Sequence, residues 1–430
     1  MLSKYLVLVT TFLSTVPLFV QCFYLRSFPP LRSSHPLPAE SLCTSFTSVP
    51  FDYHEDELAT PRIHAQVKLP VWPVYSGVVA QVLEWMGLPS LSDALLSRLG
   101  GRVVPMPLDE LDISPFLLLV HHTHSFMPFD PVRPITNMIL PEGFPAHPHS
   151  GFGTLTFTLK GGLKHRDSEG VQMQYRNGDA QWMKAGKGVI HEEMWDIPEN
   201  KFERIEIFQL WINSPSSEKF VDPSVEVLRD NEIPRLKLDE MGSELRVLYG
   251  SVNKIDKDMD DSRGGVTCSG PGDRVADSPL CISHLTLAAN SKQFVRYTSD
   301  CSFACYVQRG NMKLDGVDVG ETRMGNIITY ESRNGESASP RSSIAVIESG
   351  DEGLECLILI GKKLQERVVM GGPYVASSEA GYNHVARAWR AVGNDAFWDF
   401  RLSDDKWRQH INKINLQERL SQLNSSQRRQ

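Results

Sequence analysis

Short runs of alternating apolar and polar residues, each ended by turn-forming residues, fill most of the sequence after residue 101. The run over 154–159, for example, alternates threonine with leucine or phenylalanine and stops at Gly161. Successive side chains of a strand point to opposite faces, so this alternation predicts half-buried β-strands. A second cluster of such runs follows over about 245–362. Many short strands at regular spacing are typical of barrels and sandwiches, and the two clusters predict two β domains, over 101–240 and 241–395.

The length and the charge of the chain exclude several classes of protein. At roughly 150 residues per domain, 430 residues allow two or three domains. The 44 lysines and arginines against 52 aspartates and glutamates give a net charge of −8, without the positive field that nucleic-acid binding needs. We therefore expect no direct nucleic-acid partner. The seven cysteines form no CxxC pair, so the sequence has neither a zinc ribbon nor a thioredoxin-like motif.

The N-terminus has the layout of a secretory signal peptide. A basic residue precedes a mainly apolar stretch over 5–20, and Val20 and Cys22 place small residues before a cleavage at Phe23. We therefore assign 1–22 to a signal peptide. No later segment approaches 18 consecutive apolar residues, so we expect no membrane partner for the mature form.

A segment rich in serine and proline follows over 23–48 and contains a single acidic residue, Glu40. Such a composition is typical of a transit peptide. A signal peptide joined to a transit-like segment, with Phe23 at the junction, resembles the two-part address of algae whose plastids lie inside extra membranes. We therefore expect a plastid location, with secretion or an endomembrane lumen as the alternative.

Segments outside the two β clusters have other patterns. Apolar residues over 75–98 predict one or two short amphipathic helices, so that 23–100 forms a transit-like and helical extension. In the tail over 396–430, the sequence predicts a helix capped by Ser403 and then a disordered end. The polar and glycine-rich stretch over 256–278 is predicted to be a solvated loop.

Two short stretches concentrate side chains that bind metals. His147 and His149 are two positions apart and therefore project from one face of a strand, while Pro148 predicts that this strand is an edge or is irregular. His191 and Glu193 share a face in the same way. Three imidazoles and one carboxylate suit a six-coordinate borderline metal with two open positions. Fe(II) is the leading candidate, with Mn, Ni, Cu and Zn as alternatives; the competing interpretation is an ordinary polar surface hairpin.

These residues lie in longer motifs that resemble the pirin family. The runs over 143–149, 178–194 and 210–219 each look like a pirin motif, and the resemblance extends over about 107–394. Pirins are similar to bicupins, which consist of two double-stranded β-helix (jelly-roll) barrels, and their N-terminal barrel holds one iron through three histidines and one glutamate. The resemblance therefore implies an all-β bicupin whose metal ligands are His147, His149, His191 and Glu193.

The sequence departs from the pirin pattern beside this site. Pirins usually have an arginine directly after the second histidine and a glutamate four residues after it, where this chain has Ser150 and Gly153. The carboxylate ligand is therefore expected from Glu193, and the substrate selectivity is left open. The second barrel has no histidine between His284 and His384 and no His-x-His motif, so we expect no metal there.

Other histidines stand near the same motifs. His121, His122 and His124 follow an apolar run over 117–120, and we interpret them as hydrogen-bonded scaffold. His165 follows a glycine pair, where pirins also tend to have a histidine at the barrel mouth, so the resemblance implies a position near the mouth but no role as a ligand.

Two classes of function follow from the resemblance. Pirins include members similar to quercetin 2,3-dioxygenases, which implies an oxidoreductase that acts on a small flavonol-like aromatic with O₂. In this function Glu193 would be both a ligand and the catalytic base. The alternative is a non-enzymatic, iron-dependent redox sensor that regulates a protein partner. The N-terminal address counts against a nuclear role of this kind.

Overall fold

The computed structural model describes residues 63–68, 72–74, 86–88, 101–107, 113–129, 142–253, 267–269, 280–298, 300–322, 326–330 and 342–427. The signal peptide predicted over 1–22 and the transit-like segment over 23–48 lie outside these residues. Of the helices predicted over 75–98, only a turn at 86–88 is described. Among the described residues, no helix combines the length and the apolar character needed to span a bilayer.

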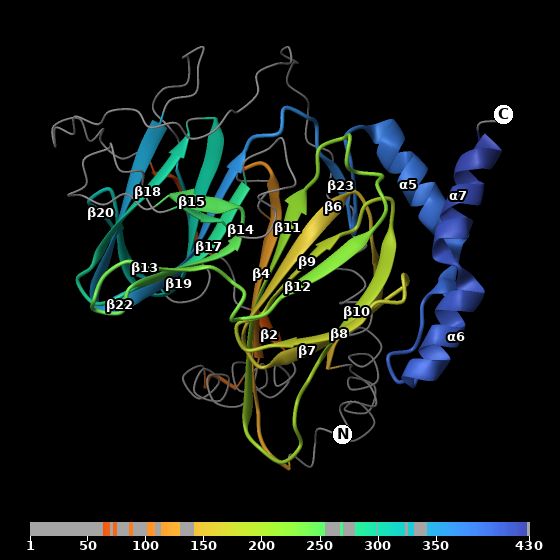
Figure 1. The fold of residues 1–430 in the computed structure, drawn as a ribbon, viewed down its shortest axis with the longest axis horizontal. Helices are drawn as coiled ribbons and strands as arrows, with labels where there is room; N and C mark the ends of the chain where they lie inside the picture. Colours follow the sequence, from red (N-terminus) through yellow and green to blue (C-terminus); the bar gives the residue numbers. More distant parts are fainter. Residues whose placement is uncertain are drawn as a thin grey trace.

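The first barrel consists of a seven-stranded sheet and a four-stranded sheet that face each other (Figure 1). In spatial order, the larger sheet contains β12 (Ser224–Leu228), β9 (Ala180–Lys184), β6 (Phe152–Lys160), β11 (Glu203–Asn213), β4 (Phe116–Phe126), β3 (Gly101–Pro107) and β2 (Trp72–Val74). The smaller sheet contains β5 (Gly143–His149), β10 (Val189–Trp195), β7 (Gly162–Asp167) and β8 (Gln172–Arg176). The predicted alternation holds in β6, where Thr156 faces the barrel interior and Phe157 faces the second barrel.

The second barrel is built from one nine-stranded sheet. Its path runs through β1 (Ile63–Lys68), β21 (Asn326–Tyr330), β19 (Cys301–Leu314), β22 (Ser342–Lys362), β17 (Leu280–Leu287), β14 (Glu244–Tyr249) and β13 (Arg235–Lys237), with β18 (Lys292–Thr298) beside β22 and β20 (Val317–Thr322) beside β19. The long strand β22 pairs with β18 over 342–348 and with β17 over 354–361, so both walls of the barrel share it. Its interior is apolar and includes the buried thiols of Cys305 and Cys356.

Two short strand pairs lie outside the main sheets. One joins β15 (Ser251–Asn253) to β16 (Thr267–Ser269), and the other joins β23 (Val369–Gly371) to β24 (Tyr374–Ala376). Strand β16 falls inside the loop predicted over 256–278, so that prediction is wrong at 267–269, where backbone pairing with β15 forms a ladder. The remainder of that stretch lies outside the described residues.

Part of the predicted N-terminal extension belongs to the barrels. Strand β1 pairs with β21 of the second barrel, and β2 pairs with β3 of the first barrel. The expectation of a transit-like and helical extension over 23–100 therefore missed two strands. The reason is that each is stabilised by pairing with a strand far away or in another cluster, which a local pattern does not show.

The C-terminal region is helical, as predicted, but more extensive. It contains α5 (Glu379–Val392), the 3₁₀ helix η4 (Asn394–Ala396), α6 (Asp404–Ile414) and α7 (Leu416–Gln427). Helix α6 begins after Ser403 as predicted, although the Ser403 hydroxyl makes no capping hydrogen bond. The helix predicted from Ser403 through Leu420 is two helices, divided at Asn415, whose backbone is left-handed. The disordered end predicted around 424–426 is wrong up to Gln427, because α7 extends to that residue. Helix α5 was not predicted.

A shared apolar core joins the two barrels. Phe157 and Phe208 from the first barrel pack in one buried cluster with Tyr306 and Leu359 from the second. Each large apolar side chain buried in this way contributes about 1.5–3 kcal/mol. Figure 1 shows the barrels side by side, with α5, α6 and α7 along the outer side of the first barrel. The predicted all-β fold of two barrels with a C-terminal helix is confirmed.

Candidate metal centre

Strand β5 carries the first histidine pair into the first barrel. It is the edge strand of the four-stranded sheet, and its register with β10 shifts between His191 and Glu193. The edge position agrees with the prediction made from Pro148, which has no N–H to donate to a second neighbour. His149 is fully buried, and His147 is half-buried, with its Nδ1 2.8 Å from the carbonyl oxygen of Pro145. A carbonyl only accepts, so this contact places hydrogen on Nδ1 and leaves the lone pair of His147 on Nε2.

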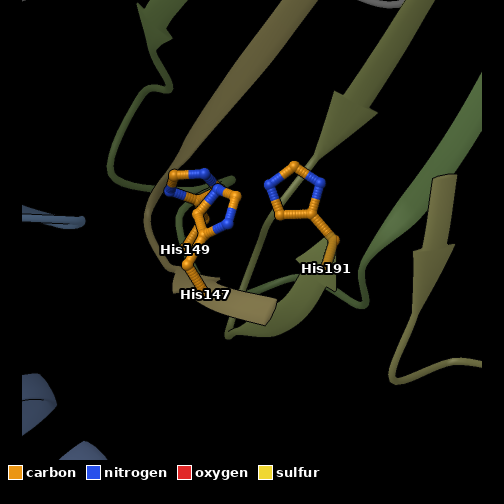
Figure 2. A group of neighbouring side chains, drawn as sticks. All are labelled: His147, His149 and His191. Carbon is orange, nitrogen blue, oxygen red and sulfur yellow. The ribbon is translucent and has the colours of Figure 1, made fainter. Parts of the chain in front are cut away.

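The three predicted histidines converge (Figure 2). In the ladder between β10 and β5, His191 lies opposite His147. The ring centroids are 4.3 Å apart for His147 and His191 and 4.9 Å apart for His149 and His191. One ring nitrogen from each of the three residues lies within 4.8 Å of the others. The residues are 42 or more positions apart across the two stretches, and only the strand pairing brings them together.

The protonation state of these histidines suits a metal. Burial lowers the pKa of His149 and of His191 well below the usual value, and the neighbouring histidines lower it further. Both rings are therefore neutral at pH 7, which is the form that ligates metals. Within the part of the chain that the structure describes, no ring nitrogen of either residue has a hydrogen-bond partner. Buried polar atoms are normally paired, so a bound cation would satisfy donor atoms that the protein leaves unsatisfied.

Glu193 lies two positions after His191 on β10, on the same face of the strand, and its carboxylate accepts several hydrogen bonds. Tyr175 donates its hydroxyl to Oε1 at 2.5 Å, Gln209 donates its amide to Oε2 at 2.6 Å, and the Thr156 hydroxyl lies 3.2 Å from Oε1. Burial and the adjacent carboxylate raise the pKa of Tyr175 well above its usual value, so Tyr175 stays a donor. Sequence reasoning missed these three residues. Their only signal was an inward-facing position in an alternating strand, which many core residues share.

His165 was expected near the barrel mouth but outside the ligand group. The structure brings one of its ring nitrogens within 4.8 Å of donor atoms of His191 and Glu193, so it forms a second, overlapping donor group. Its Nε2 lies 3.1 Å from Oδ2 of Asp167, whose Oδ1 accepts the backbone N–H groups of Glu169 and Val171. Asp167 thereby fixes the ring of His165, and the buried Nδ1 has no partner among the described residues.

The two departures from the pirin pattern have structural roles. The Ser150 hydroxyl donates to the backbone carbonyl oxygen of Lys187 at 3.2 Å, while the backbone N–H and carbonyl of Ser150 pair with Pro373 and Val375 and attach β24 to the end of β5. Gly153 faces away from the metal group, because a Cβ there would lie 3.1 Å from the ring of Trp182. A carboxylate at position 153 would therefore point toward the second barrel and not toward the histidines.

The cluster of histidines on β4 lies apart from the metal group. The Nδ1 of His121 is 2.7 Å from the hydroxyl of Tyr306, so this residue connects the two barrels. His122 and His124 turn to the opposite face and lie beside the ring of Trp195, with centroids 4.6 and 5.4 Å away. Among the described residues, none of the three histidines belongs to a potential metal-binding group.

Comparisons with known proteins agree with this architecture. Residues 104–212 match the sequence model of the family described as Pirin. A candidate quercetin 2,3-dioxygenase of Vibrio cholerae is 30% identical over 251 residues, which cover 58% of this chain and 79% of that protein. Pirin-1 of Arabidopsis thaliana is 29% identical over 285 residues, covering 65% and 84%. The chain therefore belongs to the pirin family.

Solved structures show the same fold. A quercetin 2,3-dioxygenase from Acinetobacter baumannii superimposes with a TM-score of 0.56 over 77% of this chain and 97% of that protein, at 23% sequence identity. At this level of identity the similarity establishes the arrangement of the two barrels and not the reaction.

Because several histidines are buried, we expect the metal-free protein to lose stability as the pH falls. Burial, followed by the neighbouring histidines His124 and His121, lowers the pKa of His122 to about 3 from its usual 6.5. The unfolded chain then binds the proton more readily than the folded chain, so stability is lost as the pH falls below about 6.5, by up to about 1.4 kcal/mol per pH unit and group. In the His122→Gln variant, the slope of the free energy of unfolding against pH should decrease between about pH 4 and 6. The decrease should correspond to one proton and is measured by urea unfolding at each pH. An unchanged slope would contradict a buried neutral His122.

Proposed function

We propose that the first barrel binds one divalent metal ion through His147, His149, His191 and Glu193. The observation that carries this proposal is the convergence of three histidine nitrogens within 4.8 Å, two of them on buried neutral rings without hydrogen-bond partners in the described structure. Three nitrogens and one oxygen suit a borderline cation with open positions. Fe(II) is the leading candidate, and Mn, Ni, Cu and Zn fit the same donor set.

We further propose that the metal-bound protein is a dioxygenase of flavonol-like aromatics. Several relatives have names that assign them a quercetin 2,3-dioxygenase activity. When bound, the metal would supply a Lewis acid for an aromatic hydroxyl and an electron source for O₂. The reaction would place both oxygen atoms of O₂ in the cleaved flavonol and release one ring carbon as carbon monoxide. Membership of the pirin family supports this class of reaction, and the aromatic side chains beside the histidines are consistent with an aromatic substrate.

Aromatic side chains beside the histidines form an apolar wall. Phe152 and Trp211 each have a ring centroid 5.0 Å from that of His149 and pack on one another at 4.7 Å. Such a wall would exclude water and lie against the face of a flat ligand. The wall continues at Val375 of β24, which is packed in the same cluster.

Two groups would hold the substrate hydroxyl. Glu193 Oε1 accepts hydrogen bonds from Tyr175 and Thr156, whereas Oε2 accepts only one from the described residues, donated by Gln209. We therefore assign the proton-accepting role of Glu193 to Oε2, which has the freer lone pair. His165 is the second candidate acceptor, because one of its ring nitrogens lies within 4.8 Å of donor atoms of His191 and Glu193 and Asp167 orients its ring.

Metal binding should depend on the histidine group. Substituting His147→Ala removes one of three converging nitrogens, so the purified protein should lose its single equivalent of metal, measured by inductively coupled plasma mass spectrometry. His284→Ala is the matched control, because His284 is also buried but lies on β17 of the second barrel, where its Nε2 is 3.0 Å from Oε1 of Gln308. One full equivalent of metal retained in the His147 variant would overturn the site assignment.

The reaction is tested with quercetin. Protein loaded with Fe(II) under argon and then mixed with quercetin and O₂ should consume both in equal amounts and release carbon monoxide. Glu193→Gln should reduce the turnover rate by about 10²–10⁴-fold, the usual contribution of a general base. Absence of ring cleavage and of O₂ uptake by the loaded protein would refute the dioxygenase proposal and leave the iron-dependent regulator as the remaining function.

We propose a plastid location on the basis of the two-part N-terminus. A fusion of residues 1–60 to a fluorescent reporter should enter the plastid in an alga with secondary plastids. Replacing Phe23→Ala should retain the fusion outside it if the junction residue is part of the address. Secretion of the unaltered fusion would contradict the plastid proposal.

A further inference from the structure

Strand β10 has different chemistry on its two faces. His191 and Glu193 point into the first barrel, whereas Ile190 and Glu192 alternate with them and point outward. The outer face of β10 is nevertheless buried from solvent, because Ile190 and Glu192 are each only 1% exposed. A carboxylate is rarely buried in this way unless it is paired. The partners of Glu192 therefore show what covers the metal-binding strand from outside.

Both oxygens of Glu192 are held by buried donors. Arg166 on the neighbouring strand β7 donates Nε to Oε1 at 2.5 Å, and Trp398 donates its indole N–H to Oε2 at 2.7 Å. Arg166 also donates to the backbone carbonyls of Phe400 and Leu402, at 3.1 and 2.8 Å. The outer face of β10 is thus connected to a segment that lies 206 positions later in the sequence.

That segment is part of a helical layer over 379–420, which we call the C-terminal cap. Its buried tryptophans Trp389 and Trp407 belong to one apolar cluster with Ile190 of β10, and Ala146 of β5 packs against the same cluster. Ala146 and Ile190 immediately precede two of the proposed ligands in the sequence. Figure 1 shows the cap along the outer side of the first barrel. The two strands that carry the metal group therefore have the cap on one face and the ligands on the other.

We propose that the C-terminal cap sets the position of β10, and with it His191 and Glu193, through the contact of Glu192 with Arg166 and Trp398. Glu192 is then a positioning residue for the metal centre. Metal donors must lie within about 0.2 Å of their required distances, so a small displacement of β10 would weaken binding. Removing a residue that hydrogen-bonds a metal ligand typically changes the affinity about 10–100-fold, and because Glu192 acts through the backbone of β10 we expect the lower end of this range. The inference rests on the proposed metal centre and not on the dioxygenase reaction.

Two variants remove the contact without opening a large cavity. Trp398→Phe deletes the indole donor but keeps an aromatic ring beside Trp407. The double variant Arg166→Met with Glu192→Met removes both charges together, which leaves no unpaired buried ion. The matched control is Arg419→Ala, because Arg419 bonds Asp395 and the carbonyl oxygen of Val392 inside the cap. In the described structure these hydrogen bonds stay inside the cap and do not reach β10.

The experiment uses the full chain and Co(II) alone as the probe. The Co(II) dissociation constant is measured by chelator competition. The visible d–d absorption of bound Co(II) reports the geometry of its ligands. Hydrogen–deuterium exchange of residues 189–195 is measured in the metal-free protein. Both test variants should bind Co(II) at least about tenfold more weakly, with shifted d–d bands and faster exchange in 189–195. The control variant should match the parent in all three measurements.

The results of this experiment distinguish the positioning role of Glu192 from the proposed metal centre and from the proposed reaction. Test variants that are folded and keep the parent affinity, d–d spectrum and exchange would overturn the positioning role of Glu192. An equal loss in Arg419→Ala would also overturn it, because the effect would then reflect the stability of the cap as a whole. A parent protein that binds no divalent metal would overturn the metal centre and this inference together. Metal binding without flavonol cleavage would overturn only the proposed reaction.

Discussion

The alternation of side chains along β10 is the constraint on which the rest of the structure depends. Because successive residues point to opposite faces, one short strand supplies His191 and Glu193 to the barrel interior and Ile190 and Glu192 to the outer layer. The strand is also hydrogen-bonded on both edges, to β5 and β7. The interior chemistry and the docking of the C-terminal helices are therefore coupled through the same backbone.

Burial gives the metal group its chemical character. In water, imidazoles near pH 7 are partly protonated, and a cation would have to displace those protons. Inside the barrel, desolvation keeps His149 and His191 neutral, and the fixed hydrogen bonds of Glu193 hold the carboxylate in one orientation. The protein thus prepares the donor atoms before any ligand arrives. The free energy for this arrangement comes from the packed apolar layers on both sides of the barrel wall.

Much of the site was predictable, because the signals are local. Two residues separated by one neighbour on a strand share a face whatever the fold, so His147 with His149 and His191 with Glu193 could be paired from the sequence. The supporting residues were not predictable in this way. Thr156 looks like any other threonine of an alternating run, and its contact with Glu193 arises only when β6 and β10 face each other across the barrel. His165 was assigned to the mouth of the barrel, although the structure groups it with His191 and Glu193.

The sequence by itself determined the strand-rich architecture, the two β clusters and the residue pairs that could bind a metal, because periodicity and turn residues act over a few positions. Only the tertiary structure decided that β1 joins the second barrel and that α5 covers the first. It also decided that Glu192 is paired with a tryptophan 206 positions later. These contacts depend on which surfaces remain apolar after the barrels have closed, and that is a property of the folded chain as a whole.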